Sequence, residues 1–231
     1  MSCLMVLALV GGSPVAKPQR TEFESLDQVT TVVESDAQTG TLLVTQGDCL
    51  AVRVYTQSPY THVAAVVVRN GKPVVYDSVK GTGARCLPLK TYLQSVGDDE
   101  IHVFQPRRAF SESRAGKFEA ALDSQLGRPY AVRHHLSGER GEGLHCSEYV
   151  TDALMAGRVI SAKQPARVSP ASLVEGITKH GIYSMGTTLS VKPPQPRDTQ
   201  SESGWCAGLW DDTKTCTSDC WKKVRGWCLC E

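Results

Sequence analysis

The sequence is most informative at Leu144-His145-Cys146-Ser147-Glu148-Tyr149-Val150-Thr151-Asp152-Ala153-Leu154. From Cys146 onward, apolar residues recur three, four, seven and eight positions later, which is the pattern of one face of a helix. A glycine-rich run, 138–143, precedes this segment. We therefore expect a loop to lead into a helix whose first position carries a thiol.

A thiol at the start of a helix has a distinctive chemistry. The first turn carries unpaired N–H groups and about half a positive charge, and both favour the thiolate. Such a position can lower the pKa of a cysteine from about 8.5 to roughly 3.5–7.5. Cys146 is therefore a candidate nucleophile. The alternative is a buried cysteine that only fills the core, and this segment alone does not separate the two.

A β-hairpin is predicted earlier in the chain. Residues 62–69 form an almost unbroken apolar run, typical of a strand covered on both faces, and Asn70-Gly71 is a strong turn signal. Pairing across this turn joins residues whose numbers add up to 141, so Asp77 faces residue 64 and lies diagonally near His62. A carboxylate there would orient the imidazole. Alternatively, Asp77 merely opens the next turn and His62 is an ordinary polar residue at a strand end.

The remaining periodicity predicts a mixture of strands and helices. The segment 24–34 is compatible with a strand or a short helix. His102 alternates with apolar neighbours, so we expect it to face solvent. Further strands are predicted at 41–44, 49–55, 100–104 and 182–185, and further helices from Leu87 or Pro88, from Ser111 or Ser113 to about Leu126, and from Ser169 with Pro170 at its first position.

Composition limits the possible function classes. The chain has 231 residues, of which 41% are hydrophobic and 21% charged, and a net charge of +1. This suits one large domain, or one domain plus an appendage, and argues against electrostatic binding of nucleic acid. We expect no membrane-spanning helix, because no apolar run is long enough. We also expect no cofactor or metal: the glycines at 138–143 do not follow a strand, and His134-His135 has no ligand at a suitable spacing.

The two ends of the chain differ from its middle. Residues 1–40 are interpreted as an N-terminal arm. Its apolar run at 4–10 and small residues at 11–16 resemble a secretion signal, although no Lys or Arg precedes them. This favours a periplasmic or secreted protein associated with the cell envelope or a membrane surface. The alternatives are a misassigned start or a simple flexible arm.

Residues 191–204 are predicted to be a linker, and 205–231 a Cys/Trp-rich tail with five of the nine cysteines. Disulfides are the first interpretation of the tail and a zinc site the second, because paired C-x2-C ligands are absent. Cys49 and Cys86 could form a further disulfide. The tail tryptophans would fill a miniature core or form a binding face; they are Trp205, Trp210, Trp221 and Trp227.

Three motifs now stand in order: Gly47-Asp48, Thr61-His62-Val63-Ala64, and the segment 145–150 that opens the Cys146 helix. Together they resemble the permuted papain-like cysteine hydrolases, the YiiX/YaeF-type amidases of the NlpC superfamily, in which the histidine strand precedes the cysteine helix. Gly127-Arg128-Pro129-Tyr130 resembles the Gly-x-Pro-Tyr that often precedes the cysteine loop. The resemblance covers about 41–186 and leaves the tail unexplained.

This resemblance implies an α+β, papain-like fold over 41–190, in which an antiparallel sheet packs against helices, with a small Cys-rich C-terminal appendage. It implies a thiol hydrolase in which Cys146 attacks an acyl carbonyl, His62 transfers protons and Asp77 orients His62. The expected substrate is an amide, in a peptidoglycan-type peptide or an N-acyl lipid. The alternatives are a lipid acyltransferase or thioesterase with the same triad, and a non-catalytic binding module that uses the tail.

Overall fold

The computed structural model describes residues 20–46, 58–97, 99–132, 138 and 140–191. Inter-residue contacts divide the chain into a unit spanning 1–193 and a second unit spanning 194–231, and only the first contains described residues. Several predictions fall outside the described part. They concern the apolar N-terminal run, Gly47-Asp48, the strand at 49–55, His134-His135, and nearly all of the linker and the whole tail.

The described residues form one seven-stranded sheet in the order β1-β7-β6-β2-β3-β4-β5. All neighbouring strands pair antiparallel except β1 and β7, which are parallel. The strands are β1 (Arg20–Phe23), β2 (Leu42–Gln46), β3 (His62–Arg69), β4 (Lys72–Val79), β5 (Gly83–Pro88), β6 (Glu100–Pro106) and β7 (Tyr183–Val191).

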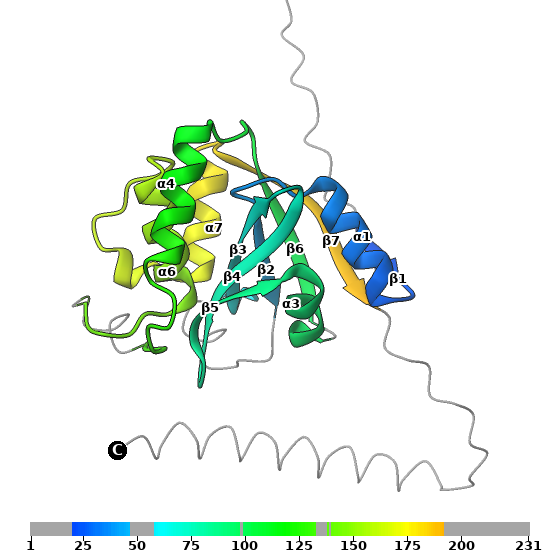
Figure 1. Cartoon of the computed structure of the whole chain (residues 1–231), viewed down its shortest axis with the longest axis horizontal. Coiled ribbons are helices and arrows are strands. Elements are labelled where there is room, and N and C mark those ends of the chain that lie inside the picture. Colours follow the sequence, from blue (N-terminus) through cyan, green and yellow to red (C-terminus); the bar gives the residue numbers. More distant parts are fainter. Residues whose placement is uncertain (1–19, 47–57, 98, 133–137, 139, 192–231) are drawn as a thin grey trace, which may run out of the picture. The chain divides into compact units, whose positions relative to one another are not determined.

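Helices cover both faces of this sheet (Figure 1). The helices are α1 (Leu26–Asp36), α3 (Leu89–Val96), α4 (Glu112–Asp123), α6 (Cys146–Ala156) and α7 (Pro170–Lys179), with a short 3-10 helix, η1 (Pro165–Arg167), before α7. One hydrophobic core lies between the sheet and α4, α6 and α7; a second lies between the sheet and α1 and α3. This arrangement confirms the predicted α+β, papain-like class.

Local signals fix several helix boundaries as expected. Ser111 caps α4, and Ser169 caps α7 with Pro170 at its first position. The ambiguous segment 24–34 is a helix, α1, capped by Ser25 and packed through Val29 and Val33 against the sheet. Residues 20–36 of the predicted arm thus contribute β1 and α1 to the folded unit.

The β3–β4 hairpin has the predicted register. Asn70 and Gly71 adopt positive φ values of 50° and 75°, as a two-residue hairpin turn requires. Ala65 pairs with Tyr76 and Arg69 with Lys72, so paired numbers add up to 141. His62 and Asp77 consequently lie diagonally on neighbouring strands, as expected from the turn.

Two expectations are wrong. His102 does not face solvent: it is 6% exposed, because β6 lies between β2 and β7 and is covered on both faces. Its Nε2 lies 2.8 Å from Glu100 Oε1, and its Nδ1 lies 3.4 Å from Thr188 Oγ1. Cys86 is a free, half-buried thiol, so the suggested disulfide with Cys49 is not formed.

Candidate active site

Two of the three predicted site residues meet on neighbouring strands. His62 is the first residue of β3 and Asp77 lies near the end of β4, and His62 Nε2 is 3.3 Å from Asp77 Oδ2. Among the described residues Nε2 has no aligned hydrogen bond, so this contact is an ion pair. Catalytic contacts often tighten only when substrate binds. The Asp77 side chain is 1% exposed and that of His62 is 20% exposed, so the carboxylate is the more deeply buried of the two.

Arg85 holds the buried carboxylate and was not predicted from the sequence. Its Nε donates to Asp77 Oδ1 at 2.7 Å and its Nη2 to Oδ2 at 3.1 Å. Burial alone would raise the pKa of Asp77, but the interactions with His62 and Arg85 outweigh burial and lower it. Arg85 is the cross-strand partner of Asp77 in the β4–β5 hairpin. Hairpin pairing around Gly81 was therefore the signal that could have identified it.

The third predicted residue, Cys146, is the first residue of α6 and is 5% exposed. Leu144, two positions before Cys146, is anchored to the sheet. Ser78 Oγ of β4 donates to its carbonyl at 2.9 Å. The N–H of Leu144 also donates to the carbonyl of Pro129 at 3.0 Å. These bonds fix where the chain enters α6, and so they fix the position of the thiol.

The Gly-Arg-Pro-Tyr segment has a clear structural role. Its Gly127 and Arg128 exchange backbone hydrogen bonds with Ala84 of β5, both at 2.9 Å. The Arg128 side chain donates to the carbonyls of Glu142 and Gly141 at 2.8 and 2.9 Å. The segment therefore connects the sheet to the glycine-rich loop that delivers Cys146.

Gly143 lies where the glycine-rich loop passes close to residues 129–131. A Cβ there would lie 2.6 Å from the Cβ of Ala131 and 2.7 Å from the carbonyl oxygen of Pro129. Any side chain at position 143 would therefore push the Cys146 loop away from 129–131.

The electrostatics of the site favour a thiolate beside an imidazolium. Burial by itself would raise the pKa of Cys146, but the charge of His62 and hydrogen bonds from His145 and His62 outweigh it and lower the pKa to about 5. Burial would likewise lower the pKa of His62, but the Cys146 thiolate and Asp77 raise it to about 10. The charges of His62 and Cys146 thus stabilise each other, and His62 lies beside Asp77.

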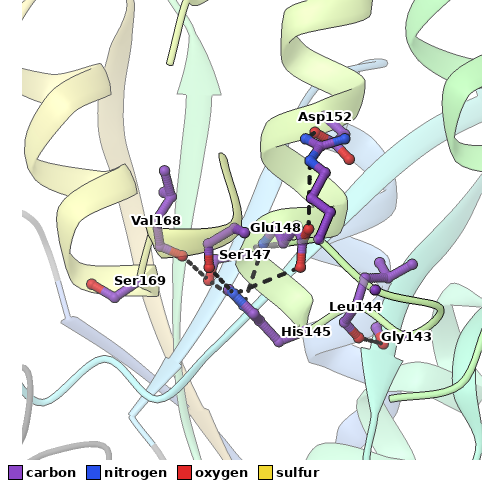
Figure 2. Close-up of polar contacts among 12 residues, drawn as sticks. Gly143, Leu144, His145, Ser147, Glu148, Asp152, Val168 and Ser169 are labelled. Atoms are coloured by element: carbon purple, nitrogen blue, oxygen red, sulfur yellow. Dashed lines mark hydrogen bonds and ion pairs between the residues drawn. The ribbon is translucent and has the colours of Figure 1, made fainter. Parts of the chain in front are cut away.

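Glu148 lies in a cluster of charged residues at the start of α6. It is buried, and its Oε1 lies 3.8 Å from Nε of Arg140, which also forms an ion pair with Asp152 (Figure 2). His145, the residue before the nucleophile, lies in the same cluster and contacts Ser147 (Figure 2). Nothing in the sequence pattern assigned His145 a role, although it directly precedes Cys146.

The described part of the chain contains neither a cluster of metal ligands nor a helix that could span a membrane. No group of three or more His, Cys, Asp or Glu side chains there is arranged to hold a metal ion. None of the helices in that part is both long and apolar enough to cross a bilayer.

Comparisons with known proteins give two results. A model of the permuted papain-like amidases of the YaeF/YiiX type, the C92 family, matches residues 36–192. The crystal structure of the metalloprotein yiiX from Escherichia coli O157:H7 is similar with a TM-score of 0.45 and 22% identity, over 66% of this chain and 88% of that one. No curated protein matches the chain.

Proposed function

The chain belongs to the C92 family of permuted papain-like amidases, and from this premise we propose that it is a thiol hydrolase that cleaves an amide bond with Cys146, His62 and Asp77. The observation that carries this proposal is an imidazole 3.3 Å from a buried carboxylate on the neighbouring strand, together with a buried thiol at a helix start whose pKa the charge of that imidazole lowers. A nucleophile beside a base that a third group orients is the arrangement that covalent catalysis needs.

The proposed reaction has two steps. The Cys146 thiolate attacks the carbonyl carbon of the amide, and the His62 imidazolium gives its proton to the departing amine, which leaves an acyl-enzyme thioester. Neutral His62 then takes a proton from water, whose oxygen attacks the thioester; the C–S bond breaks, the carboxylic acid leaves, and the Cys146 thiolate and His62 imidazolium are regenerated. Asp77 orients His62 through both steps and stabilises its protonated form.

The start of α6 would also stabilise the developing oxyanion. The N–H of Cys146 is among the first N–H groups of the helix, which have no partner within it. A donor aimed at the oxyanion typically contributes about 3–4 kcal/mol to transition-state stabilisation. We propose the Cys146 N–H as one such donor.

The proposed substrate is an amide of the cell envelope, in a peptidoglycan-type peptide or an N-acyl lipid. The support for this location is the apolar run at 4–10 with the small residues that follow, which resembles an export signal. The two substrate kinds share the chemistry of the scissile bond and differ in what flanks it.

The test is hydrolysis of two substrate panels, peptidoglycan-derived peptides and N-acyl amides, by the full chain and by a Cys146→Ala variant. We expect turnover in one panel and its complete loss in Cys146→Ala. A Cys86→Ala variant is the matched control, because Cys86 is the other free thiol among the described residues and lies outside the site. Full activity in Cys146→Ala would refute the proposal. Transfer of the acyl group to an added amine or alcohol in preference to water would replace hydrolysis by acyl transfer.

A further inference from the structure

His145 has an unusual position for a histidine. It is the N-cap of α6, a place that Ser, Thr, Asp or Asn usually occupies. The ring is 5% exposed and has partners on both nitrogens. Its Nε2 donates to the carbonyl of Ala166 in η1 at 2.8 Å, and its Nδ1 lies 3.4 Å from the N–H of Glu148 and 3.1 Å from Ser147 Oγ.

These contacts suit both protonation states of the ring. In the neutral ring Nδ1 accepts the Glu148 N–H and caps the helix. Ser147 Oγ donates at 2.7 Å to the carbonyl of Val168. With its only hydrogen used there, the hydroxyl oxygen can accept from a protonated Nδ1. An imidazolium therefore also finds a partner for each of its own N–H groups, while the Glu148 N–H loses Nδ1 as its acceptor.

The charged groups around His145 lie on several elements. On α6 they are Cys146, Glu148 and Asp152; Glu148 Oε2 lies 3.9 Å from His145 Nε2. The loop before α6 contributes Arg140, which pairs with Glu148 and Asp152, and η1 contributes Arg167 as its charged residue. His62 reaches the cluster through Cys146. Figure 2 shows how closely His145, Ser147 and Glu148 gather at the start of the helix.

We propose that His145 is a positioning residue of this site: a second imidazole that ties the start of α6 to η1 and stabilises the Cys146 thiolate from within the protein, while His62 exchanges protons with the substrate. This inference rests on the proposed function, in which Cys146 is the nucleophile. Burial alone would lower the pKa of His145, but the interaction with Cys146 and the bond to Ala166 raise it, as expected if the ring and the thiolate stabilise each other.

The test is the pH dependence of iodoacetamide labelling at Cys146, followed by peptide mass spectrometry in His145→Asn and His145→Asp. Asn is a good N-cap, so if the ring only capped the helix, His145→Asn would leave the labelling midpoint at its wild-type value. The proposal instead predicts an ordered rise. Loss of the ring raises the midpoint by about one pH unit, and a carboxylate beside the thiol raises it by about one unit more. His180→Asn, at the exposed end of α7, is the control and should leave the midpoint unchanged.

A second measurement does not depend on these variants folding. Linkage requires that a ring which stabilises the thiolate lose affinity for its own proton when the thiolate is removed. We therefore expect the imidazole pKa of His145, followed by NMR in the full chain, to fall in Cys146→Ser. An unchanged pKa there, or equal midpoints in wild type and His145→Asn, would overturn the proposal. Neither readout uses a substrate, so its failure is distinct from a failure of the proposed hydrolysis.

Discussion

The two ends of strand β3 carry the same kinds of charge but differ in how far water reaches them. At its start, His62 pairs with Asp77, whose side chain is 1% exposed. At its end, Arg69 pairs with Glu119 and Asp123, and these three side chains are 30–42% exposed. Both clusters join neighbouring elements. In each of them, an arginine donates two hydrogen bonds to one aspartate carboxylate.

The chemical consequences of the two clusters differ. The Arg69 cluster fastens α4 to the β3–β4 hairpin: Arg69 Nη2 donates to both oxygens of Asp123, at 2.9 and 2.7 Å, and Tyr76 Oη donates to one of them at 2.6 Å. Exposed ion pairs of this kind contribute about 0–1 kcal/mol. At the His62 end, burial makes each charge depend on its partner and shifts the pKa of His62, Asp77 and Cys146. Removal from water, more than the presence of charge, distinguishes a candidate active site.

The largest contrast between the two ends should be in catalysis. We expect His62→Ala to lower kcat/KM on the amide substrate by about 10⁴-fold, because the base and the partner of the thiolate are lost together. Arg69→Ala, at the other end of the same strand, should leave kcat/KM unchanged. Steady-state kinetics of both purified variants measures the contrast.

Equal losses of kcat/KM in His62→Ala and Arg69→Ala would show that both substitutions act by destabilising the fold, and not through the chemistry of His62. Thermal melting of each variant provides the control, because a melting temperature close to that of wild type assigns the loss to chemistry.

A second contrast concerns two buried or half-buried thiols, whose pKa values are shifted in opposite directions. The pKa of Cys146 is lowered to about 5, whereas burial raises the pKa of the Cys86 thiol. As pH rises, labelling of Cys146 by iodoacetamide should therefore increase through about pH 5, and labelling of Cys86 only at alkaline pH. Turnover should rise over the same acid limb and fall as His62 loses its proton near pH 10. Labelling of Cys146 should not fall there, since the thiolate persists.

Peptide-resolved mass spectrometry across pH 4–11 distinguishes the two thiols in one sample. If both thiols followed the same alkaline curve, the thiolate–imidazolium pair would be absent. Cys146 would then be an ordinary core cysteine.

Features that depend on neighbours in sequence were predictable. The Asn70-Gly71 turn determines the hairpin register, and with it the diagonal placement of His62 and Asp77. The heptad-like spacing after Cys146 predicts α6, and Ser169 with Pro170 predicts the start of α7. In each case, a few adjacent residues contain the physical cause.

Features that depend on the packing of distant elements were not predictable in the same way. Alternation suggested an exposed His102, but the order of strands in the sheet buries it between β2 and β7. His145 stood in the central motif, yet its role depends on Ala166, 21 residues away. Arg85 is intermediate: it lies across a short hairpin from Asp77, and only a complete register for β4 and β5 reveals it.

The smallest predicted effect concerns stability and compares the two arginines directly. Arg85→Met should lower the free energy of unfolding by about 3–5 kcal/mol, because it leaves the buried Asp77 carboxylate without its arginine. Arg69→Met should lower it by only about 0–1 kcal/mol, since its partners are exposed to water. Urea unfolding at pH 7 measures both.

The pH dependence of the stability loss in Arg85→Met tests whether the unpaired Asp77 carboxylate causes it. The pKa of Asp77 is lowered in the folded protein, so its contribution is present above the unfolded value of about 3.9 and is lost as pH falls through the lower folded value. The difference between wild type and Arg85→Met should therefore shrink in acid, while that for Arg69→Met stays small throughout. A stability loss in Arg85→Met that did not change with pH would assign the loss to packing of the arginine side chain. The two ends of β3 would then differ in how their arginines pack, and not in the burial of charge.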